Sequence, residues 1–550
     1  MNWTRSMVRE SVAGSGLRWW LAGLAACGVI AACDGSGGMG GQGSPGSGST
    51  DLRVLDSIPA SAASGVDPMT QISVRFDRLL DSATVTPAAF SVWTTTALAG
   101  NTQVSGDSIV FTPDEALDLF ATVSVRMTEA IRSTAGDRLP AAETIQFLTR
   151  SGNWAAPETL PTNATITGLA GASTGEAVAL RFRSASPWSD LLVSHKLPGS
   201  TWEAEATLFG DGSVAFARIA LDETGWGVAV AKRSAGGNSF ATWTRERSPA
   251  GLWASAIEAA PLDSGFGEPQ LGIVEPGRAV LSWRRNSSSE ICVSVLAAGG
   301  TWSAPLRVSA DGVDADSPAL ATDGRGSALV VWREDSQRIH AARYTVAGGW
   351  SASQLVHTEF VCCVSGPAVS LAAGERSLVA FERGGSVFAA SYQTAASIWG
   401  AAATVSGVGC AGAFSRISVA SNDEGRALVT WHCDQDLWSA TADPGAAWGA
   451  PFMLGDTGPT ADSVSSLDRN GNATVLWSRE PSAGAPRNIV FRQRAPSQPW
   501  GPMEVISSPT RCAVAPRLVT LLNGRLRAVW TYTINCDFNQ GRGSEGALFD

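Results

Sequence analysis

The stretch "PALATDGRGSALVVW", residues 318–332, decides the fold of this chain. Two short apolar segments flank an Asp-Gly-Arg-Gly turn, and Asp323 and the glycines tolerate the positive φ angles that tight hairpins need. The stretch therefore predicts a β-hairpin that ends on Trp332. By the same reasoning, Asp468 and Asn523 are turn formers in later copies of this pattern.

The pattern recurs through the last 400 residues of the chain. Tryptophans that open a short strand lie 48 to 52 residues apart, at 154, 202, 253, 302, 350, 399, 448 and 500, which defines eight units. Each unit then carries the hairpin, although units one and two end weakly, at Phe182 and Ala231. About 50 residues and four strands per repeat predict a β-propeller blade, because one sheet cannot bury both of its apolar faces alone.

The predicted fold class is therefore all-β, with a propeller of eight blades over 151–550; seven blades or an open solenoid are alternatives. The strand at Trp154 precedes every hairpin, so we expect it to complete the blade that starts near Pro516 and to close the ring. The repeats resemble "GNAxAVW" repeats of bacterial secreted proteins and, more loosely, sialidase-like propellers. Sialidase chemistry needs a tyrosine nucleophile, whereas Tyr344, Tyr392 and Tyr532 lie on or just beyond predicted blade strands.

Residues 51–150 have a different pattern of short alternating strands. Strands are predicted at 71–76, 90–93, 108–113, 121–127 and 144–149, separated by Pro, Gly and Asp turns, which indicates a β-sandwich. The "D-x-x-T-V" turn from Asp81 to Val85 and the closing strand from Phe147 to Thr149 resemble the bacterial Ig-like domain of the S-layer-protein (SbsA) type. That resemblance implies a spacer or stalk without catalytic residues.

The first 33 residues are predicted to be a targeting segment. Three arginines precede the apolar run "WWLAGLAACGVIAAC", which is too short for a membrane span. This segment resembles a bacterial lipoprotein signal, with Cys33 as the lipidated residue and Cys27 as the alternative. The Gly/Ser-rich residues 34–50 would then be a flexible tether. We expect a lipid-anchored protein of the cell envelope, on the outer membrane or cell surface, with a periplasmic position as the alternative.

Charge excludes one class of partner. The formal net charge is −10 and the pI is about 5.1, so no basic surface is available for nucleic acid. The four histidines, at 195, 340, 357 and 432, lack metal-ligand spacing. The "GASTG" motif at 171–175 fits a serine-nucleophile pattern, but its place in unit one favours a hairpin turn.

Cysteines beyond the signal predict disulfides in an exported protein. Cys410 and Cys433 flank the hairpin of unit six, and Cys512 and Cys536 hold matching places in unit eight. We therefore predict two bridges, 410–433 and 512–536, on one face of the propeller. The adjacent Cys362 and Cys363 form a vicinal bridge or leave one thiol to pair with Cys292; the sequence leaves this open.

The bridged face is the predicted binding face. The residue after each blade-core position projects toward it, which makes six charged or imidazole side chains candidate ligand contacts: Arg183, Lys232, Arg284, Arg333, Glu382 and His432. Solvated loop charges without a shared ligand are the alternative. "DGVDAD", with Asp311, Asp314 and Asp316, offers oxygen ligands for Ca²⁺, against the alternative of a polar loop. No other cofactor is expected.

These observations together favour a binding or scaffolding head over an enzyme. We expect a monomeric, membrane-anchored lipoprotein whose propeller binds a glycan or protein ligand and is held out by the Ig-like spacer. The alternative is a glycan-active hydrolase or lyase with its site at the channel mouth. Paired acids or a Tyr-Glu pair in the channel would favour the enzyme, and a mixed-charge surface would favour the binder.

Overall fold

The computed structural model describes residues 51–550 except 162, 185–188, 238, 265–266, 360–363, 375, 408–413, 459–461, 483, 535 and 537–541. Residues 51–550 form one compact unit. The predicted signal, the tether, Cys27 and Cys33 lie outside the described residues, as do Cys362, Cys363 and Cys410. None of the helices found in the described part of the chain is long and apolar enough to cross a membrane.

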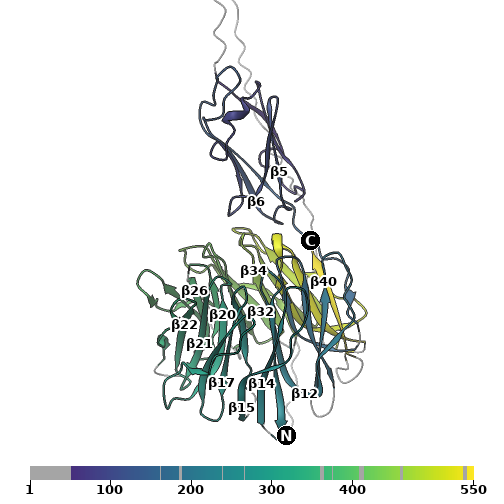
Figure 1. The fold of residues 1–550 in the computed structure, drawn as a ribbon, viewed down its shortest axis with the longest axis vertical. Coiled ribbons are helices and arrows are strands. Elements are labelled where there is room, and N and C mark those ends of the chain that lie inside the picture. Colours follow the sequence, from purple (N-terminus) through teal and green to yellow (C-terminus); the bar gives the residue numbers. More distant parts are fainter. Residues whose placement is uncertain are drawn as a thin grey trace, which may run out of the picture. The chain divides into compact units, whose positions relative to one another are not determined.

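The N-terminal segment is a sandwich of two antiparallel sheets (Figure 1). One sheet has the order β1 (Val54–Ile58), β2 (Ile72–Phe76), β5 (Ser108–Pro113), β4 (Gly100–Ser105). The other has the order β3 (Phe90–Trp93), β6 (Thr122–Met127), β7 (Glu143–Leu148). The five predicted strands are present; β1 and β4 were missed because they are mostly exposed and carry no clear apolar alternation.

Alternation builds the core of this sandwich. Phe76, Val123 and Phe147 are buried with 0 to 2 % exposure. The residue that precedes each of them on its strand is exposed. The predicted acidic turn is a short 3₁₀ helix, η1 (Ser82–Thr84), whose N-cap is Asp81. The Asp81 carboxylate accepts a hydrogen bond of 3.1 Å from the Ala83 amide, as expected of an N-cap.

The repeats form seven antiparallel sheets in the described part of 151–550, and each unit is named after its hairpin. Units 1 and 2 share one sheet, made of β9 (Thr165–Gly171), β10 (Ala177–Ser184), β11 (Ser189–Lys196), β12 (Ala206–Leu221), β13 (Gly227–Gly236), β14 (Ser239–Arg247) and β15 (Ile257–Ser264). The first half of β12 pairs with β11 and its second half with β13, so one long strand serves both units.

Units 3 to 5 follow as separate sheets. Unit 3 contains β16 (Gln270–Glu275), β17 (Arg278–Arg285), β18 (Glu290–Ala297) and β19 (Leu306–Arg307). Unit 4 contains β20 (Ala315–Thr322), β21 (Ser327–Glu334), β22 (Arg338–Thr345), β23 (Gly349–Trp350) and β24 (Gln354–Thr358). Unit 5 contains β25 (Ala368–Ala372), β26 (Arg376–Arg383), β27 (Ser386–Gln393), β28 (Ile398–Trp399) and β29 (Ala403–Thr404).

Units 6 to 8 complete the series. Unit 6 contains β30 (Phe414–Ser421), β31 (Ala427–Cys433), β32 (Asp436–Ala442) and β33 (Phe452–Asp456). Unit 7 contains β34 (Ser463–Leu467), β35 (Ala473–Arg479), β36 (Asn488–Arg494) and β37 (Glu504–Val505). Unit 8 contains β38 (Cys512–Thr520), η2 (Leu522–Gly524), β39 (Leu526–Thr533), β40 (Gly543–Phe549) and the early strand β8 (Glu158–Thr159).

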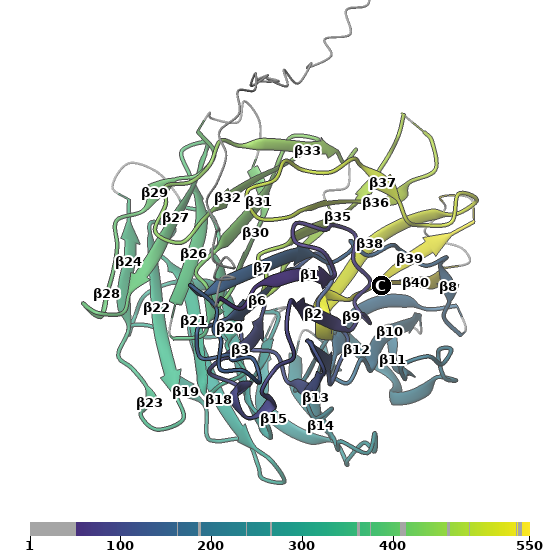
Figure 2. The same cartoon turned by 90° about the horizontal axis from the view of Figure 1, so that it is seen from above.

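The ring closes with strands from both ends of the array, as the sequence predicts. β8 pairs with β40, and Trp154 bridges to Phe549 (Figure 2). The first strand of each unit, here called the inner strand, contacts the inner strand of the next, and β38 contacts β9. The sheets therefore surround a channel lined by inner strands, and the sheets of units 8 and 1 pack against each other where the ring closes.

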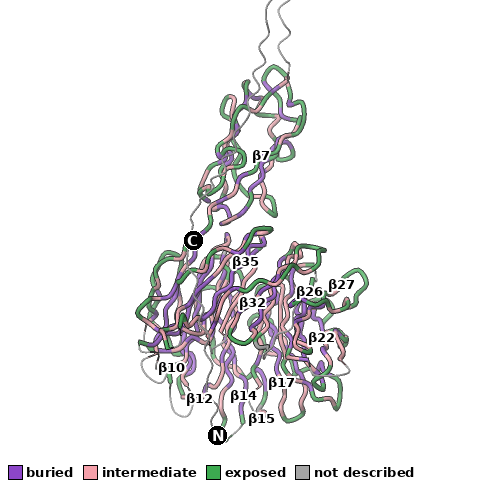
Figure 3. The backbone as a smooth tube through the Cα atoms, turned by 180° about the vertical axis from the view of Figure 1, so that it is seen from behind, coloured by how far each residue is buried: buried purple, intermediate pink, exposed green. Residues whose placement is uncertain are grey.

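The strands of each unit differ in how far they are buried (Figure 3). The second strands are almost fully buried, and Trp332, Trp477 and Trp530 have 0 % exposure. The inner strands have mostly intermediate exposure, as expected beside a channel. Each hairpin tryptophan thus packs between neighbouring sheets. This packing explains why a large apolar residue recurs at the same position of each unit.

Unit 1 departs from the expected pattern at its aromatic position. Arg181, not the predicted Phe182, faces unit 8 there and has 0 % exposure. Its guanidinium donates to Ser194 Oγ at 2.7 Å and to Glu205 Oε2 at 3.0 Å, and also binds the Pro161 carbonyl. Phe182 packs toward unit 2 instead. A buried arginine whose two Nη atoms are hydrogen-bonded thus replaces the tryptophan, which a pattern of apolar residues could not reveal.

The hairpin turns form as predicted. Asp323 Oδ1 accepts hydrogen bonds from the amides of Arg325 and Ser327 at 2.8 and 2.9 Å, and Asp468 Oδ1 accepts one from Asn472 at 2.8 Å. Asn523 has a φ of 62°, the left-handed conformation that asparagine tolerates. The "GASTG" motif is also a turn, between β9 and β10, where Ser173 Oγ donates to the Glu223 carbonyl at 2.9 Å.

Candidate functional site

One end of the channel is built from the residues at which the inner strands begin. Ser317, Arg416 and Ala515 occupy the same place in units 4, 6 and 8, with φ angles of 52°, 49° and 54°. Each lies at a shift in the register between the inner strand and its partner, which is a β-bulge. Bulges change the direction of side chains, so these strands have a common geometry at their entry.

Charged side chains gather at this entry, which we call the channel mouth and define by Arg218, Glu268, Arg416, Asp462 and Arg517. Arg218 and Arg517 take matching places on the inner strands of units 2 and 8, paired with Val230 and Val529. Arg416 forms an ion pair with Asp462. The mouth therefore carries three cations and two anions from five different units.

The positive charges of Arg218 and Arg517 are only partly balanced by neighbouring carboxylates. Arg218 Nη2 lies 3.6 Å from Glu268 Oε2, and Arg218 Nε donates to the Pro269 carbonyl at 3.2 Å. Arg517 Nη1 donates to the Pro516 carbonyl at 3.0 Å, and no carboxylate pairs with it among the residues described in 51–550. Burial lowers the pKa of both guanidinium groups, and each also experiences repulsion from a neighbouring arginine.

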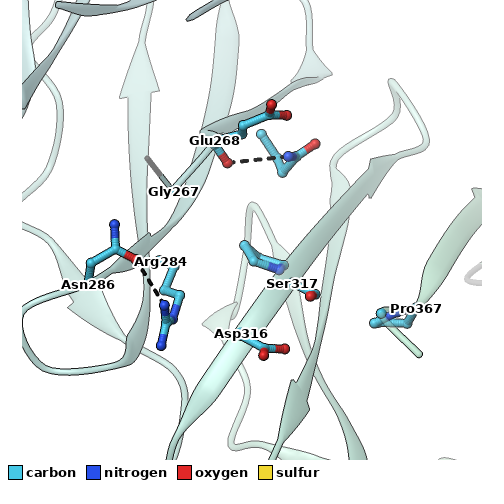
Figure 4. A pocket seen from close by; sticks show the side chains of 10 residues that line it. Gly267, Glu268, Arg284, Asn286, Asp316, Ser317 and Pro367 are labelled. Carbon is cyan, nitrogen blue, oxygen red and sulfur yellow. Dashed lines mark hydrogen bonds between the residues drawn. The ribbon is translucent and has the colours of Figure 1, made fainter. Parts of the chain in front are cut away.

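A cavity of about 630 Å³ adjoins the mouth over units 3 to 5. Its lining includes Glu268, Arg284, Asn286, Asp316 and Ser317, whose side chains surround one hollow in Figure 4. Arg284 Nη1 donates to Asn286 Oδ1 at 3.1 Å, which fixes one wall. The volume is within the range of small-ligand sites, and the lining offers both donors and acceptors.

Four of the six predicted contact residues instead connect neighbouring units. Lys232 Nζ donates to the Gly267 carbonyl at 2.8 Å, Arg284 Nε to Ala315 at 2.8 Å and Arg333 Nη1 to Val364 at 2.9 Å. His432 Nε2 lies 2.7 Å from Ser463 Oγ. Each of these side chains reaches the start of the next unit, so we call them struts.

The other two candidates form contacts within their own units. Arg183 Nη2 donates to Asp190 Oδ2 at 2.8 Å, and Glu382 Oε1 accepts a hydrogen bond from the Gly385 amide at 2.9 Å. The structure thus gives all six residues protein partners and does not gather them around one point. Of the six, only Arg284 lines the cavity at the mouth.

The three predicted Ca²⁺ ligands pair with three different arginines. Asp311 binds Arg307 at 2.7 Å, Asp314 binds Arg284 at 2.9 Å and Asp316 binds Arg333 at 2.7 Å. Within the described ranges, no group of three or more His, Cys, Asp or Glu side chains is placed to hold a metal. The arginines separate the carboxylates that a cation would need together.

Cys512 and Cys536 lie at the same end of their hairpin as the mouth. Cys512 and Cys536 form a disulfide with a Cα–Cα distance of 5.1 Å. The predicted 410–433 bridge involves Cys410, which lies outside the described residues. Cys292 is a buried free thiol in β18, so it does not pair with Cys362 or Cys363.

The tyrosines and two of the other histidines pack against side chains of the sheets. Tyr344 and Tyr392 pack against Trp350 and Trp399, and Tyr532 lies under the Arg511 guanidinium at 4.0 Å. His195 packs beside Trp253 and His357 beside Phe381. None of the described tyrosines therefore forms a Tyr-Glu pair at the mouth.

Sequence reasoning missed the arginines of the mouth. Arg218, Arg416 and Arg517 each precede an Ile or Leu in the first arm of a hairpin, in "ARIAL", "SRISV" and "PRLVT". A charged residue in an otherwise apolar arm was the available signal, because such a residue must face water or a partner. Only ring closure brings these arms together.

Comparisons with known proteins identify a family for the N-terminal segment alone. Residues 48–149 match the profile of a bacterial Ig-like domain. No curated protein matches the chain. Among solved structures, the Dos1 propeller covers 72 % of this chain and 95 % of its own length, at 8 % identity and a TM-score of 0.46.

Two glycan-active enzymes match with lower TM-scores. A polysaccharide lyase of family PL25, an ulvan lyase, covers 64 % of this chain and 96 % of its own, at 10 % identity and a TM-score of 0.39. The NanB sialidase of Streptococcus pneumoniae covers 87 % and 83 %, at 10 % identity and a TM-score of 0.33. At these identities the likeness concerns fold alone. The chain thus joins a segment that matches a bacterial Ig-like domain to a propeller-like ring of sheets.

Proposed function

We propose that this protein is a binding head of the bacterial cell envelope, and that its channel mouth takes an anionic group of its ligand. The observation that carries this proposal is the arrangement of Arg218 and Arg517, two partly exposed guanidinium groups at matching places on the inner strands of units 2 and 8. An anion placed between them would gain charge-assisted hydrogen bonds and relieve their mutual repulsion. Carboxylate or sulfate groups of an acidic glycan fit this chemistry.

Geometry favours binding over hydrolysis. The mouth has a mixed charge, with Asp462 paired to Arg416 and Glu268 lying beside Arg218. Each carboxylate thus lies beside an arginine, which is the mixed charge expected of a binding surface and not the pair of acids that glycoside hydrolysis uses. The adjoining cavity, with Asn286 and Ser317 in its wall, would hold the neutral part of the same ligand.

The test compares acidic with neutral oligosaccharides on the full-length protein by isothermal titration calorimetry. We expect hexuronic-acid oligomers to bind, and Arg517→Gln and Arg218→Gln each to weaken binding by about tenfold or more, since a charge-assisted hydrogen bond contributes about 1.5–3 kcal/mol. The matched control is Arg338→Gln, which removes an exposed arginine of β22 that pairs with Asp335. Equal binding by all variants, or release of cleaved sugar by the wild type, would overturn the proposal.

Anchoring is the second part of the proposal and rests on the apolar run that ends in Cys33. A lipid on this cysteine would hold the Ig-like segment and the ring at a membrane surface. Labelling with a fatty-acid analogue in a bacterial host tests it. We expect Cys33→Ser to abolish the label and Cys27→Ser to leave it; the reverse result would move the anchor to Cys27.

A further inference from the structure

One position on the third strand of each unit fills the groove toward the preceding unit. It is the residue that pairs with the start of the second strand, as in Ala328 with Tyr344 and Ala473 with Arg494. Seven of these residues have long or bulky side chains and one does not; in order they are Lys196, Arg247, Leu296, Tyr344, Tyr392, Ala442, Arg494 and Phe549. We call this residue the groove filler.

Arginine fillers show how such a groove receives a guanidinium group. Arg494 of unit 7 donates to Thr441 Oγ1 of unit 6 at 2.7 Å. Arg247 of unit 2 donates to the carbonyl of Gly225 in its own hairpin turn at 2.5 Å and binds the Glu176 carboxylate of unit 1. Acceptors for this group therefore come from both walls of the groove.

The groove between units 5 and 6 is open because its filler is Ala442. The cavity there measures about 310 Å³, against about 20 Å³ for the matching groove between units 6 and 7, which Arg494 fills. Ala442 packs on the apolar cluster shared by units 5 and 6 and, unlike Arg494 in the closed groove, does not reach the lining of the cavity. A methyl group cannot reach the opposite wall.

The open groove keeps the acceptors that an arginine would use. Ser391 pairs with Leu378 as Thr441 pairs with Leu428, so its exposed hydroxyl takes the place of Thr441 Oγ1. Gly425 takes the place of Gly225 in the hairpin turn, with a similar φ of 89° against 84°. Glu424 also lines the groove, where its carboxylate pairs with Arg426 at 3.4 Å.

The walls also match the aliphatic part of such a side chain. Leu378, Ala427 and Pro444 line the cavity and would cover the three methylene groups of an arginine. Arg376 on one wall does not exclude a second arginine, because the matching residue of the closed groove, Arg426, lines that groove together with Arg494. The Arg376 guanidinium is held by the Asp423 carbonyl.

We infer that this groove is a docking site for an arginine side chain presented by a protein partner. The chain itself contains the bound form of the interaction, in Arg494 on Thr441. The formal charge of −10 further favours a basic partner segment. This inference is independent of the anion proposed at the channel mouth.

The test uses N-acetyl-arginine amide as the probe, and N-acetyl-citrulline amide as its uncharged match, on the full-length protein. NMR or calorimetric titration should show saturable binding of the arginine probe, at least tenfold tighter than the citrulline probe. Ala442→Arg should abolish binding and raise Tm, because it copies Arg494 into the open groove. Ser391→Ala should weaken binding at least threefold, whereas Thr441→Ala, in the closed groove, should leave it unchanged.

Several outcomes would overturn the inference. Binding that survives Ala442→Arg would place the probe elsewhere, and equal binding of citrulline would remove the role of charge. Binding of a neutral monosaccharide that Ala442→Arg abolishes, without binding of the arginine probe, would assign the groove to a sugar. Arg517→Gln should leave arginine binding unchanged, so failure at the channel mouth and failure at this groove are distinguishable.

Discussion

The ammonium group of Lys232 in unit 2 donates a hydrogen bond of 2.8 Å to the backbone carbonyl of Gly267, at the entry to unit 3. Lys232 is 5 % exposed and also lies 5.4 Å from the ring centre of Phe240. Burial lowers the pKa of this ammonium group. A buried lysine with a backbone acceptor in the next sheet joins the two units, and it is not free to meet a ligand.

Removing this strut should destabilise the ring and spare the ligand site. We expect Lys232→Ala to lower the free energy of unfolding by about 1.5–3 kcal/mol, because it leaves the Gly267 carbonyl without its charged donor. Urea denaturation measures the loss, and calorimetry with an acidic oligosaccharide should show unchanged affinity. Lost affinity in a folded Lys232→Ala protein would return this residue to the ligand site.

His432 should make stability fall on acidification. The side chain has 0 % exposure, and burial lowers its pKa from 6.5 to about 4. Because the unfolded chain then binds the proton more tightly than the folded one, the contribution of His432 is complete above pH 6.5 and is lost progressively down to pH 4. Relative to His432→Asn, the wild type should lose about 2 kcal/mol between pH 7.5 and pH 5. Parallel pH profiles of the two proteins would contradict this.

Asp468 should act in the opposite direction. Burial raises its pKa from 3.8 to about 6, against the hydrogen bonds that it accepts from Asn472. The folded state therefore holds this proton more tightly, so the contribution to stability is complete below pH 3.8 and is lost as the pH rises through 6. Relative to Asp468→Asn, the wild type should gain about 2.5 kcal/mol between pH 7.5 and pH 4. The gain is measured as the difference between the two urea curves at each pH.

The disulfide in unit 8 should stabilise the closure of the ring. Cys512 and Cys536 are 24 residues apart and connect the inner strand to the loop after β39. A bridge across a loop of this length restricts the unfolded chain and contributes about 3 kcal/mol. We expect Cys512→Ser with Cys536→Ser to lower Tm, and reducing agent to lower Tm of the wild type further, because Cys433 is disulfide-bonded as well. An unchanged Tm of the double variant under oxidising conditions would contradict the role of the 512–536 bridge.

Local sequence was enough to predict the repeats. Interactions within a few residues determine the turn at Asp323 and Gly324 and the alternation of the two arms that ends on Trp332. Each hairpin can therefore be predicted from its own sequence. Closure through Trp154 followed from the order of the strands. The Ig-like strands β1 and β4 were missed because mostly exposed residues leave no apolar alternation to detect.

The direction of long polar side chains could not be predicted from the sequence. Position along the chain suggested that Lys232 and Arg333 face a ligand, but both donate to the next unit. The backbone acceptor of each such side chain lies in the next sheet, more than 30 residues further along the sequence, and loops of variable length separate the two. Hydrogen-bond partners at that distance are set by the packing of sheets.

The sequence by itself therefore determined the all-β class, the repeated hairpin and the Ig-like segment, because turn chemistry and alternation act over a few residues. Tertiary structure alone decided that Arg218 and Arg517 face one channel and that Ala442 leaves a groove that Arg494 fills one unit later. Those relationships need the circle to be closed, since each joins residues from different sheets whose approach depends on how every sheet packs on the next.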